Sequence, residues 1–420
     1  MSEPSVIVIG AGPAGLCLAR ALSQRGLCVD VFERQSRESV ARPAFDGREI
    51  ALTRASMRIL SELGAWQRIP EDAVSPLVGA RVADGDAGHG FEVDAAPLGH
   101  QALGALVANR DIRAAAWELV ESDPRIRLHF DAVVASVASD PRQAEVVLED
   151  GRRFQAPLLV AADSRFSSIR RAMGIPVAMH DFGKTMLVCR VRLEKPHGGI
   201  ALEWFGTGQT RALLPLRGQL ASAVVTVTGA EAERLKSLDA DAFSRELQSR
   251  YGNRFGAMAL EGEAHAYPLV ATWARRFVGP RFALLGDAAV GMHPVTAHGF
   301  NLGLASVERL ASAVADAVAA HHDPGHPALL ARYQRRHRAG CLPLFLGTAL
   351  VVRMFTDDRR PIQPLRRAII QAGRMLPPLR HALADTLLDD GPVDPSPLQR
   401  LRRSVALLKP AARGHGAHAR

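Results

Sequence analysis

Three glycines near the start of the chain, Gly10, Gly12 and Gly15, have the spacing of a phosphate-binding turn. The turn follows a short apolar run, Val6–Ile9, and precedes an alanine- and leucine-rich run over residues 14–24. In such a turn Gly10 permits the tight bend, Gly12 lets the backbone approach a pyrophosphate, and Gly15 allows close helix–strand packing. The free amide groups at the start of the helix then face the anion. The spacing therefore predicts a nucleotide-binding βαβ unit.

An acidic residue at the end of the next apolar run supports this interpretation. Glu33 directly follows Val29–Phe32 and lies about 20 residues beyond the turn. A carboxylate at this place accepts hydrogen bonds from ribose hydroxyls and repels a 2′-phosphate. The pattern favours an adenosine nucleotide without that phosphate. By itself it does not distinguish FAD from NAD.

A second group follows the apolar run Phe282–Leu285. Asp287 comes just after this run, where a carboxylate can hold a sugar-alcohol hydroxyl such as the ribitol of FAD. His293-Pro294 follows, and Gly299 stands near an expected helix start, whose positive end would stabilise charge on a reduced isoalloxazine. The alternative is structural: Asp287 caps a helix and His293-Pro294 forms a turn.

A third group spans residues 162–171, from Ala162-Asp163-Ser164-Arg165 onward. A solvated turn with an N-cap explains Asp163 and Ser164 adequately, with the arginines on an exposed face, and this structural interpretation is favoured for the segment taken by itself.

The elements around these groups predict an α/β architecture. Leu158–Ala162 and Phe282–Leu285 are expected to return to the sheet started by Val6–Ile9, which would be parallel. Between these returns, strand-like runs with no intervening helix predict an antiparallel, β-rich insertion over about residues 180–270. These runs are residues 185–194, 200–205, 210–216 and 220–227. From residue 305 to about residue 389 the chain is expected to be helical.

Composition narrows the class of protein. The chain has 420 residues, a net charge of +9 and only 5% aromatic residues, too few to favour stacking on single-stranded nucleic acid. Its basic residues are nearly all arginine, which genome base composition explains, so no nucleic-acid partner is expected.

The four cysteines are scattered without a zinc or redox spacing, and no metal site is predicted. The sequence shows no leader pattern, and its longest uncharged run, residues 341–352, is too short to span a bilayer. A cytoplasmic protein is expected, with the inner membrane face as an alternative location.

Taken together, these segments resemble one family. Gly-Ala-Gly-Pro-Ala-Gly, Glu33-Arg34, Asp46-Gly47-Arg48, Ala-Asp-Ser at 162–164 and Gly-Asp-Ala-Ala at 286–289 recur in the order of the class A FAD-dependent aromatic hydroxylases. Residues 161–167, 291–303 and 353–359 are similar to the ubiquinone-biosynthesis hydroxylases. The segments at 161 and 291 look most like the UbiM branch, which includes 5-demethoxyubiquinol 5-hydroxylase. The resemblance covers about residues 5–390. It implies a fold similar to p-hydroxybenzoate hydroxylase: a Rossmann-like FAD-binding domain with a parallel sheet, an antiparallel β-rich substrate domain, and C-terminal helices.

The resemblance also implies site residues for FAD. The diphosphate would lie on Gly10, Gly12, Ala14 and Gly15, the adenosine beside Glu33 and Arg34, and the rest of the cofactor near Arg48, Arg110 and Asp163. Gly286 and Asp287 would hold the ribitol, and Pro294, Gly299 and Asn301 would approach the isoalloxazine. Ser164 stands where the family more often has glycine, and its side chain restricts the turn.

The implied reaction is hydroxylation of a polyprenylated phenol or benzoquinol in ubiquinone biosynthesis, with O₂ activated as a flavin hydroperoxide and NAD(P)H as the expected electron donor. His293 could orient substrate or peroxide, and a structural role is its alternative. Leu213, Leu214 and Leu216 could line the substrate wall, although ordinary sheet core is favoured for them. Two further hypotheses stay open: a hydroxylase or epoxidase of another phenolic metabolite, and a non-catalytic flavin-binding scaffold in a lipid-biosynthesis assembly.

The domain organisation expected from these patterns is discontinuous. The FAD-binding domain takes residues 1–72, 99–180 and 272–335, and the substrate domain takes residues 73–98 and 181–271. A helical region over 336–390 and a basic tail over 391–420 follow. In the tail, Leu398, Leu401, Val405 and Leu408 form one helical stripe beside arginines, which suits either an anionic membrane surface or docking on the chain's own domain.

Overall fold

A six-stranded sheet forms the centre of the nucleotide-binding half in the computed structural model, which describes residues 5–85, 89–96, 99–206, 208–293 and 299–356. Its strand order is β18-β19-β12-β1-β2-β8, and every pair is parallel except β18–β19. The predicted return of the two later runs to the first sheet is confirmed. The strands are β1 (Val6–Ile9), β2 (Val29–Phe32), β8 (Ile126–His129), β12 (Leu158–Ala161), β18 (Val278–Gly279) and β19 (Phe282–Leu284).

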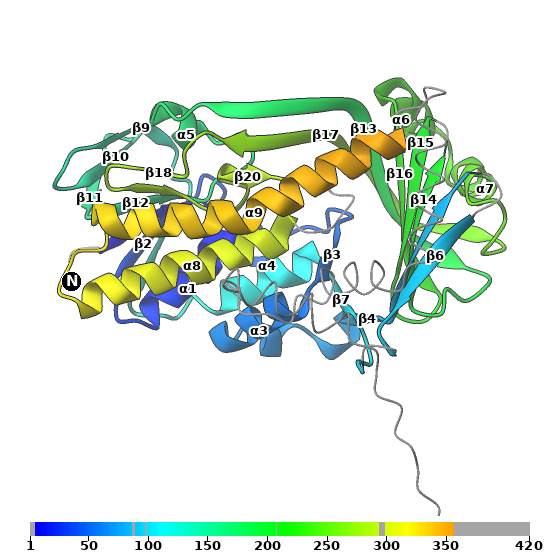
Figure 1. Cartoon of the computed structure of the whole chain (residues 1–420), viewed down its shortest axis with the longest axis horizontal. Coiled ribbons are helices and arrows are strands. Elements are labelled where there is room, and N and C mark those ends of the chain that lie inside the picture. Colours follow the sequence, from blue (N-terminus) through cyan, green and yellow to red (C-terminus); the bar gives the residue numbers. More distant parts are fainter. Residues whose placement is uncertain (1–4, 86–88, 97–98, 207, 294–298, 357–420) are drawn as a thin grey trace, which may run out of the picture.

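The two faces of this sheet are covered differently (Figure 1). In β1 all four residues are buried, and alternate side chains enter separate cores. Val6 and Val8 pack with the helical side, and Ile7 and Ile9 pack with the side that carries a small antiparallel sheet. The helices are α1 (Pro13–Ser23), α2 (Arg37–Ala41), α3 (Arg54–Leu63), α4 (Asn109–Glu118) and α8 (Gly299–Ala319), and the small sheet is β9 (Val134–Ser139), β10 (Ala144–Leu148) and β11 (Arg153–Ala156), with α5 (Ser168–Ala172) beside it.

The second half is built on an eight-stranded sheet with the order β20-β17-β13-β16-β15-β14-β5-β6. Its pairs are antiparallel, as predicted, with one exception: β14 pairs in parallel with β5. The exception arises because β5 and β6 come from a segment about 100 residues earlier in the chain and add to the open edge of β14. The strands are β5 (Gly79–Asp84), β6 (His89–Asp94), β13 (Val177–Leu193), β14 (Ile200–Gly206), β15 (Gln209–Pro215), β16 (Leu220–Val227), β17 (Met258–Ala274) and β20 (Val290–Gly291).

Two long strands join the halves. β13 and β17 have 17 residues each and stay paired from the nucleotide-binding side to the large sheet, with an irregularity near Gly183. Figure 1 shows them as the long ribbons that cross the top of the molecule. Helix α9 (Pro327–Thr356) packs on α8 and reaches β14 at its far end. The expected domain boundaries at residues 180/181, 271/272 and 335/336 therefore fall within β13, β17 and α9.

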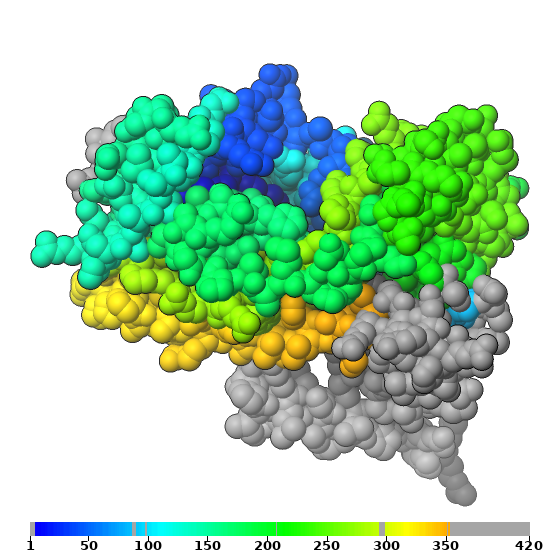
Figure 2. All heavy atoms as spheres, turned by 90° about the horizontal axis from the view of Figure 1, so that it is seen from above, coloured from blue at the N-terminus to red at the C-terminus, as the bar shows by residue number. Residues whose placement is uncertain are grey.

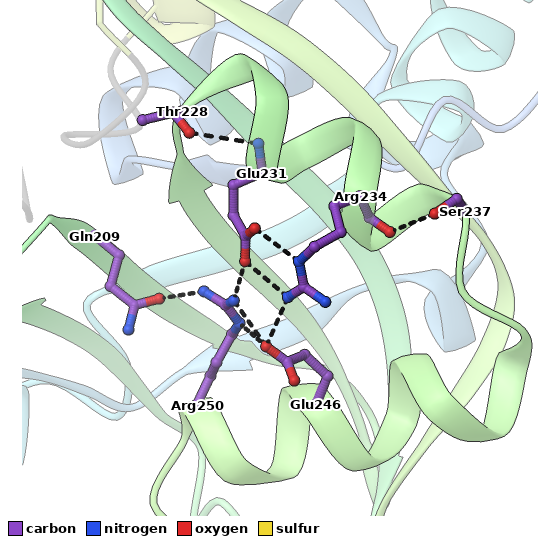
Figure 3. Close-up of polar contacts among 7 residues, drawn as sticks. All are labelled: Gln209, Thr228, Glu231, Arg234, Ser237, Glu246 and Arg250. Carbon is purple, nitrogen blue, oxygen red and sulfur yellow. Dashed lines mark hydrogen bonds and ion pairs between the residues drawn. The ribbon is translucent and has the colours of Figure 1, made fainter.

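Helices α6 (Gly229–Lys236) and α7 (Ala240–Arg250) cover the outer face of the large sheet. Arg234 and Arg250 hold these helices together by pairing with Glu231 and Glu246, and Arg250 also donates to Gln209 on β15 (Figure 3). Leu213 is fully buried in the core beneath these helices, as the favoured interpretation of it requires.

A three-stranded sheet with the order β3-β7-β4 lies between the two halves. It consists of β3 (Glu49–Leu52), β4 (Ser75–Leu77) and β7 (Gly104–Ala108), with short 3-10 turns at Trp66–Arg68, Glu71–Ala73 and Gly286–Ala288 elsewhere in the fold. Within the described ranges, no helix combines the length and apolar character needed to cross a membrane. The same residues contain no cluster of three or more side chains suited to a metal ion. The predicted tail stripe lies outside the described residues.

Candidate active site

The glycine turn between β1 and α1 has the geometry that its spacing requires. Gly10 has φ +109°, and a Cβ there would lie 2.5 Å from the carbonyl oxygen of Ala162. A Cβ on Gly15 would lie 2.1 Å from the carbonyl oxygen of Gly10, so this position needs glycine for packing. A Cβ on Gly12 would meet no atom within 4 Å. Gly12 thus keeps open the space over the start of α1, where the amide groups would meet an anion.

Glu33 lies beside the glycine turn and also holds it in place by a hydrogen bond. Its Oε2 accepts a hydrogen bond of 2.8 Å from the Ala11 amide, and its Oε1 accepts one of 3.0 Å from the Gln35 amide. Each carboxylate oxygen has a second lone pair, so the group retains capacity for ribose hydroxyls. Arg34, beside it, is exposed.

The second group lies against the first. Gly286 has φ +57°, donates its amide hydrogen to Ser306 Oγ at 3.1 Å, and leaves 3.6 Å between its would-be Cβ and the Cβ of Ala14. Asp287 follows at the end of β19, with its side chain 40% exposed. Residues 286–287 and the glycine turn, which are far apart in sequence, therefore border one site.

Arg165 of the third group, expected on an exposed face, instead holds Asp287 in place. It donates to Asp287 Oδ2 at 3.3 Å and to the carbonyl oxygens of Val270 and Met292 at 2.6 and 3.1 Å. These contacts join the third group to β17 and to the segment that carries His293. The position of Arg165 next to Asp163-Ser164 was the only signal for it in the sequence.

Asp163 and Ser164 do not form the expected N-cap, because the N-cap of α5 is Ser167, whose hydroxyl accepts from the Arg170 amide. Asp163 supports the same helix start from outside the cap. Its Oδ2 accepts from the Ser168 amide at 3.0 Å, at the start of α5. Its Oδ1 is buried and has no hydrogen-bond partner among the described residues. A buried acceptor without a partner costs about 1–3 kcal/mol, which a bound hydroxyl would relieve. Together with the open space at Gly12, this acceptor shows that the residues fit a dinucleotide with a polyhydroxyl chain.

Figure 2 shows the opening of this region. The surface is hollowed above the dark-blue N-terminal residues, between the blue, teal and green segments that surround them.

Arg48 and Arg110 lie on the loop and helix that face the large sheet. Arg48 pairs with Asp46, whose carbonyl oxygen accepts from Tyr267 Oη at 2.6 Å. Arg110 lies 5.7 Å from the ring centre of Phe45, and Arg190 of β13 lies 4.3 Å from the same ring. This arginine–aromatic stack docks the loop around residue 46 on the substrate side.

A buried ion pair completes that contact. Glu49, with a side chain only 1% exposed, accepts from Arg190 Nε at 2.8 Å. Burial raises the pKa of Glu49 above its ordinary value, although the guanidinium of Arg190 opposes this. The pair joins β3 to β13, and removing one partner would leave an uncompensated buried charge.

The remaining predicted cofactor residues belong to the start of α8. The Asn301 amide donates to the Ala51 carbonyl oxygen at 2.8 Å and accepts from the Thr53 amide at 3.2 Å, which fixes α8 on the end of β3. Gly299 begins α8, and a Cβ on it would meet nothing within 4 Å. Pro294 lies outside the described residues.

His293 lies between the two halves, just after β20. It is 8% exposed, and its ring centre lies 4.7 Å from that of Phe182, edge to face. Burial, assisted by the positive charge of Arg165, lowers the pKa of His293 to about 4. The imidazole is therefore neutral at pH 7 and can orient a hydroxyl, but it carries no positive charge there.

Two small adjoining cavities share Phe182 and His293 as lining residues. Their walls are mainly apolar, with one lysine and a few hydroxyls. The first is also lined by Lys184, Phe205, Thr210, Thr226, Leu269 and Val352, and the second by Ala271, Met292, Phe345, Thr348 and Ala349. Neither cavity is lined by Leu213, Leu214 or Leu216.

Comparison with known proteins shows the family to which the chain belongs. The model of a family described as "FAD binding domain" matches residues 3–341. The chain is 40% identical over 386 residues to the ubiquinone hydroxylase UbiM of Neisseria meningitidis, covering 91% of this chain and 84% of that protein. It is 34% identical over 411 residues to the ubiquinone hydroxylase UbiL of Rhodospirillum rubrum, covering 96% and 93%.

Among solved structures, the p-nitrophenol 4-monooxygenase PnpA of Pseudomonas putida superposes with a TM-score of 0.72 at 19% identity, covering 92% of this chain and 97% of that one. At that identity the likeness shows a shared fold. The family model and the two relatives carry the assignment further: the chain belongs to the FAD-binding-domain family, as a class A flavoprotein of the ubiquinone hydroxylase group.

Proposed function

We propose that this FAD-dependent monooxygenase hydroxylates the aromatic ring of a polyprenylated phenol or benzoquinol in ubiquinone biosynthesis, with O₂ and NAD(P)H. The observation that carries the proposal is the pair of apolar cavities at His293, beside the nucleotide-binding elements. Two relatives at 34–40% identity bear the name ubiquinone hydroxylase, which supports this substrate class.

The residues that would hold FAD come from all three sequence groups. The backbone over Gly12 and the start of α1 would take the diphosphate, and Glu33 and Arg34 the adenosine. Asp163 Oδ1 has no hydrogen-bond partner in the described part of the chain, and Asp287 is partly exposed beside Arg165; both carboxylates would take hydroxyls of the ribitol. When bound, the reduced flavin supplies the electrons and the site at which O₂ is activated.

The cavity residues would orient the ring and exclude water. Phe182, Phe205 and Leu269 give an apolar wall, which keeps competing water away from the reacting ring. His293 is neutral at pH 7 and would exchange a hydrogen bond with the ring hydroxyl. Such contacts position the carbon to be hydroxylated, and no side-chain nucleophile is needed.

Replacing Asp287 by alanine is expected to weaken FAD binding about tenfold, because one charge-assisted hydrogen bond to the cofactor is lost. Arg165 would keep its two carbonyl partners, so the local fold should persist. Flavin fluorescence titration of the apoprotein measures the change, with Asp150→Ala, at an exposed turn, as the control. An unchanged dissociation constant would remove Asp287 from the cofactor site.

The reaction itself is tested with purified protein, FAD, NADPH and a phenol carrying one or two isoprene units. Substrate-stimulated NADPH oxidation with one atom from ¹⁸O₂ in the product supports the proposal. NADPH oxidation without an oxygenated product would contradict it. Oxygenation of unprenylated phenols alone would favour another phenolic metabolite as the substrate.

Because the proposed substrate carries a long apolar chain, we also place the protein at the cytoplasmic face of a membrane, in reach of other enzymes of the pathway. Restoration of ubiquinone in a bacterium that lacks its own ring hydroxylases tests the whole assignment.

A further inference from the structure

The second half of α9 presents leucines to solvent. Leu342, Leu346 and Leu350 are 44%, 57% and 59% exposed. They recur every four residues, so they form a single stripe on one side of the helix. Exposed leucines are usually scattered singly, and a row of three on one helix face calls for an apolar environment.

The opposite side of the same segment lines the cavities. Thr348 and Val352 are buried, and Phe345 and Ala349 lie on the flank between the buried side and the leucine stripe. Phe345 and Ala349 share a cavity with His293. One helical segment therefore separates the candidate ring-binding site from an apolar outer surface by its own thickness. In Figure 2 the orange part of α9 is visible at the surface, below the green strands of β13.

The charge distribution along α9 suits a lipid surface. Arg335 and Arg336 are exposed about two turns before Leu342, and Arg335, seven residues before Leu342, lies on the same side of the helix as the leucines. No charged residue occurs between them and the end of the stripe other than the partly buried Arg338. Arginines next to an exposed apolar stripe are the pattern of a helix that rests on anionic phospholipid, with its leucines at the acyl boundary.

We propose that Leu342, Leu346 and Leu350 form a membrane-contact face, and that the isoprenoid chain of the substrate leaves the bilayer there and enters the cavities past Phe345 and Ala349. This inference rests on the proposed function for its substrate, but the membrane contact does not. A second copy of the chain fits the leucine face less well than a membrane does. The stripe is only about 12 Å long, and a stable interface needs about 800 Å² from each partner.

The test compares two double variants of the full chain. Leu346→Glu/Leu350→Glu places two charges on the face, and Val133→Glu/Val318→Glu places two charges at other exposed apolar positions. Binding is measured by flotation with vesicles of 30% phosphatidylglycerol and 70% phosphatidylethanolamine, and with phosphatidylcholine vesicles. We expect the first variant to bind the anionic vesicles at least about tenfold more weakly than the parent, and the second to bind like the parent.

Turnover separates this proposal from the proposed function. The first variant should show a raised KM for a long-chain prenylated phenol embedded in vesicles, and an unchanged KM for a one-isoprene phenol in solution. Equal vesicle binding by both variants would overturn the membrane face, as would a change from dimer to monomer confined to the first variant. If vesicle binding falls as expected but neither phenol is hydroxylated, the contact face stands and the proposed reaction fails.

Discussion

Replacing Gly12 by valine is expected to abolish FAD retention while leaving the fold intact. The new side chain meets no protein atom, because a Cβ at this position has nothing within 4 Å. It would instead fill the space over the start of α1 that the diphosphate needs. Displacing the diphosphate from two backbone amides, at about 1.5–3 kcal/mol for each hydrogen bond to a charged group, weakens binding by about 100-fold or more.

Variants at two further glycines test whether the loss of flavin is specific to Gly12. Gly15→Val should fail to fold, since its Cβ would overlap the Gly10 carbonyl oxygen at 2.1 Å. Gly229→Val, at the first turn of α6, should keep both fold and flavin, because its nearest contact is 3.8 Å away. Circular dichroism reports the fold, and the flavin absorbance of the purified protein reports the cofactor. A Gly12→Val protein that retains stoichiometric flavin would refute the diphosphate site.

Local motifs could be predicted from the sequence because their chemistry depends on neighbouring residues. Gly10, Gly12 and Gly15 act within a single turn, and the apolar runs that flank them showed which strands share a parallel sheet. Asp287 could be predicted to lie near the glycine turn, because an acidic residue after a buried strand stands at the edge where ligands bind to such sheets.

Contacts between distant segments could not be predicted in this way. In the sequence, Arg165 has the pattern of an exposed arginine in a turn. Its three acceptors belong to segments near β17 and β20, which lie beside it only in the folded chain. The docking of Tyr267 on residue 46 joins positions more than 200 residues apart. Leu213 and Leu214 are neighbours in one strand and so face opposite ways, but the sequence does not show which face α6 and α7 cover.

Glu203 is the clearest example of a residue whose surroundings depend on which face of its strand the helices cover. In β14 the side chains of Leu202 and Trp204 enter the core beneath α6 and α7, so Glu203 and Phe205 point to the other face. Phe205 lines the larger cavity. In the described part of the chain no cation pairs with Glu203, and burial alone raises its pKa from an ordinary 4.5 to about 8. The carboxyl is therefore mainly protonated at pH 7, which keeps a negative charge off the sheet face that carries Phe205.

This shift makes the free energy of unfolding depend on pH with a definite sign. Below pH 4.5 the carboxyl is protonated in both states and has no effect. Between pH 4.5 and about 8 the unfolded chain has released the proton while the folded chain retains it, so the folded state loses stability as pH rises. Above about pH 8 both states are ionised and the loss is constant. Because the side chain is partly exposed, we expect a loss of about 2 kcal/mol at pH 7, at the low end of what the shift implies.

Glu203→Gln removes the ionisation and keeps the shape of the side chain, so it should stabilise the protein by about 2 kcal/mol at pH 7, more at pH 8.5, and negligibly at pH 4.5. Urea unfolding followed by tryptophan fluorescence at these three pH values measures the difference. Glu261→Gln, which breaks only an exposed pair with Arg192, should change stability by less than about 0.5 kcal/mol, with little pH dependence. A Glu203→Gln protein that is less stable than the parent at pH 8.5 would mean that the native carboxylate is ionised and paired. In that case a negative charge would be a fixed feature of the sheet face beside Phe205, and the apolar wall proposed for the substrate would be wrong.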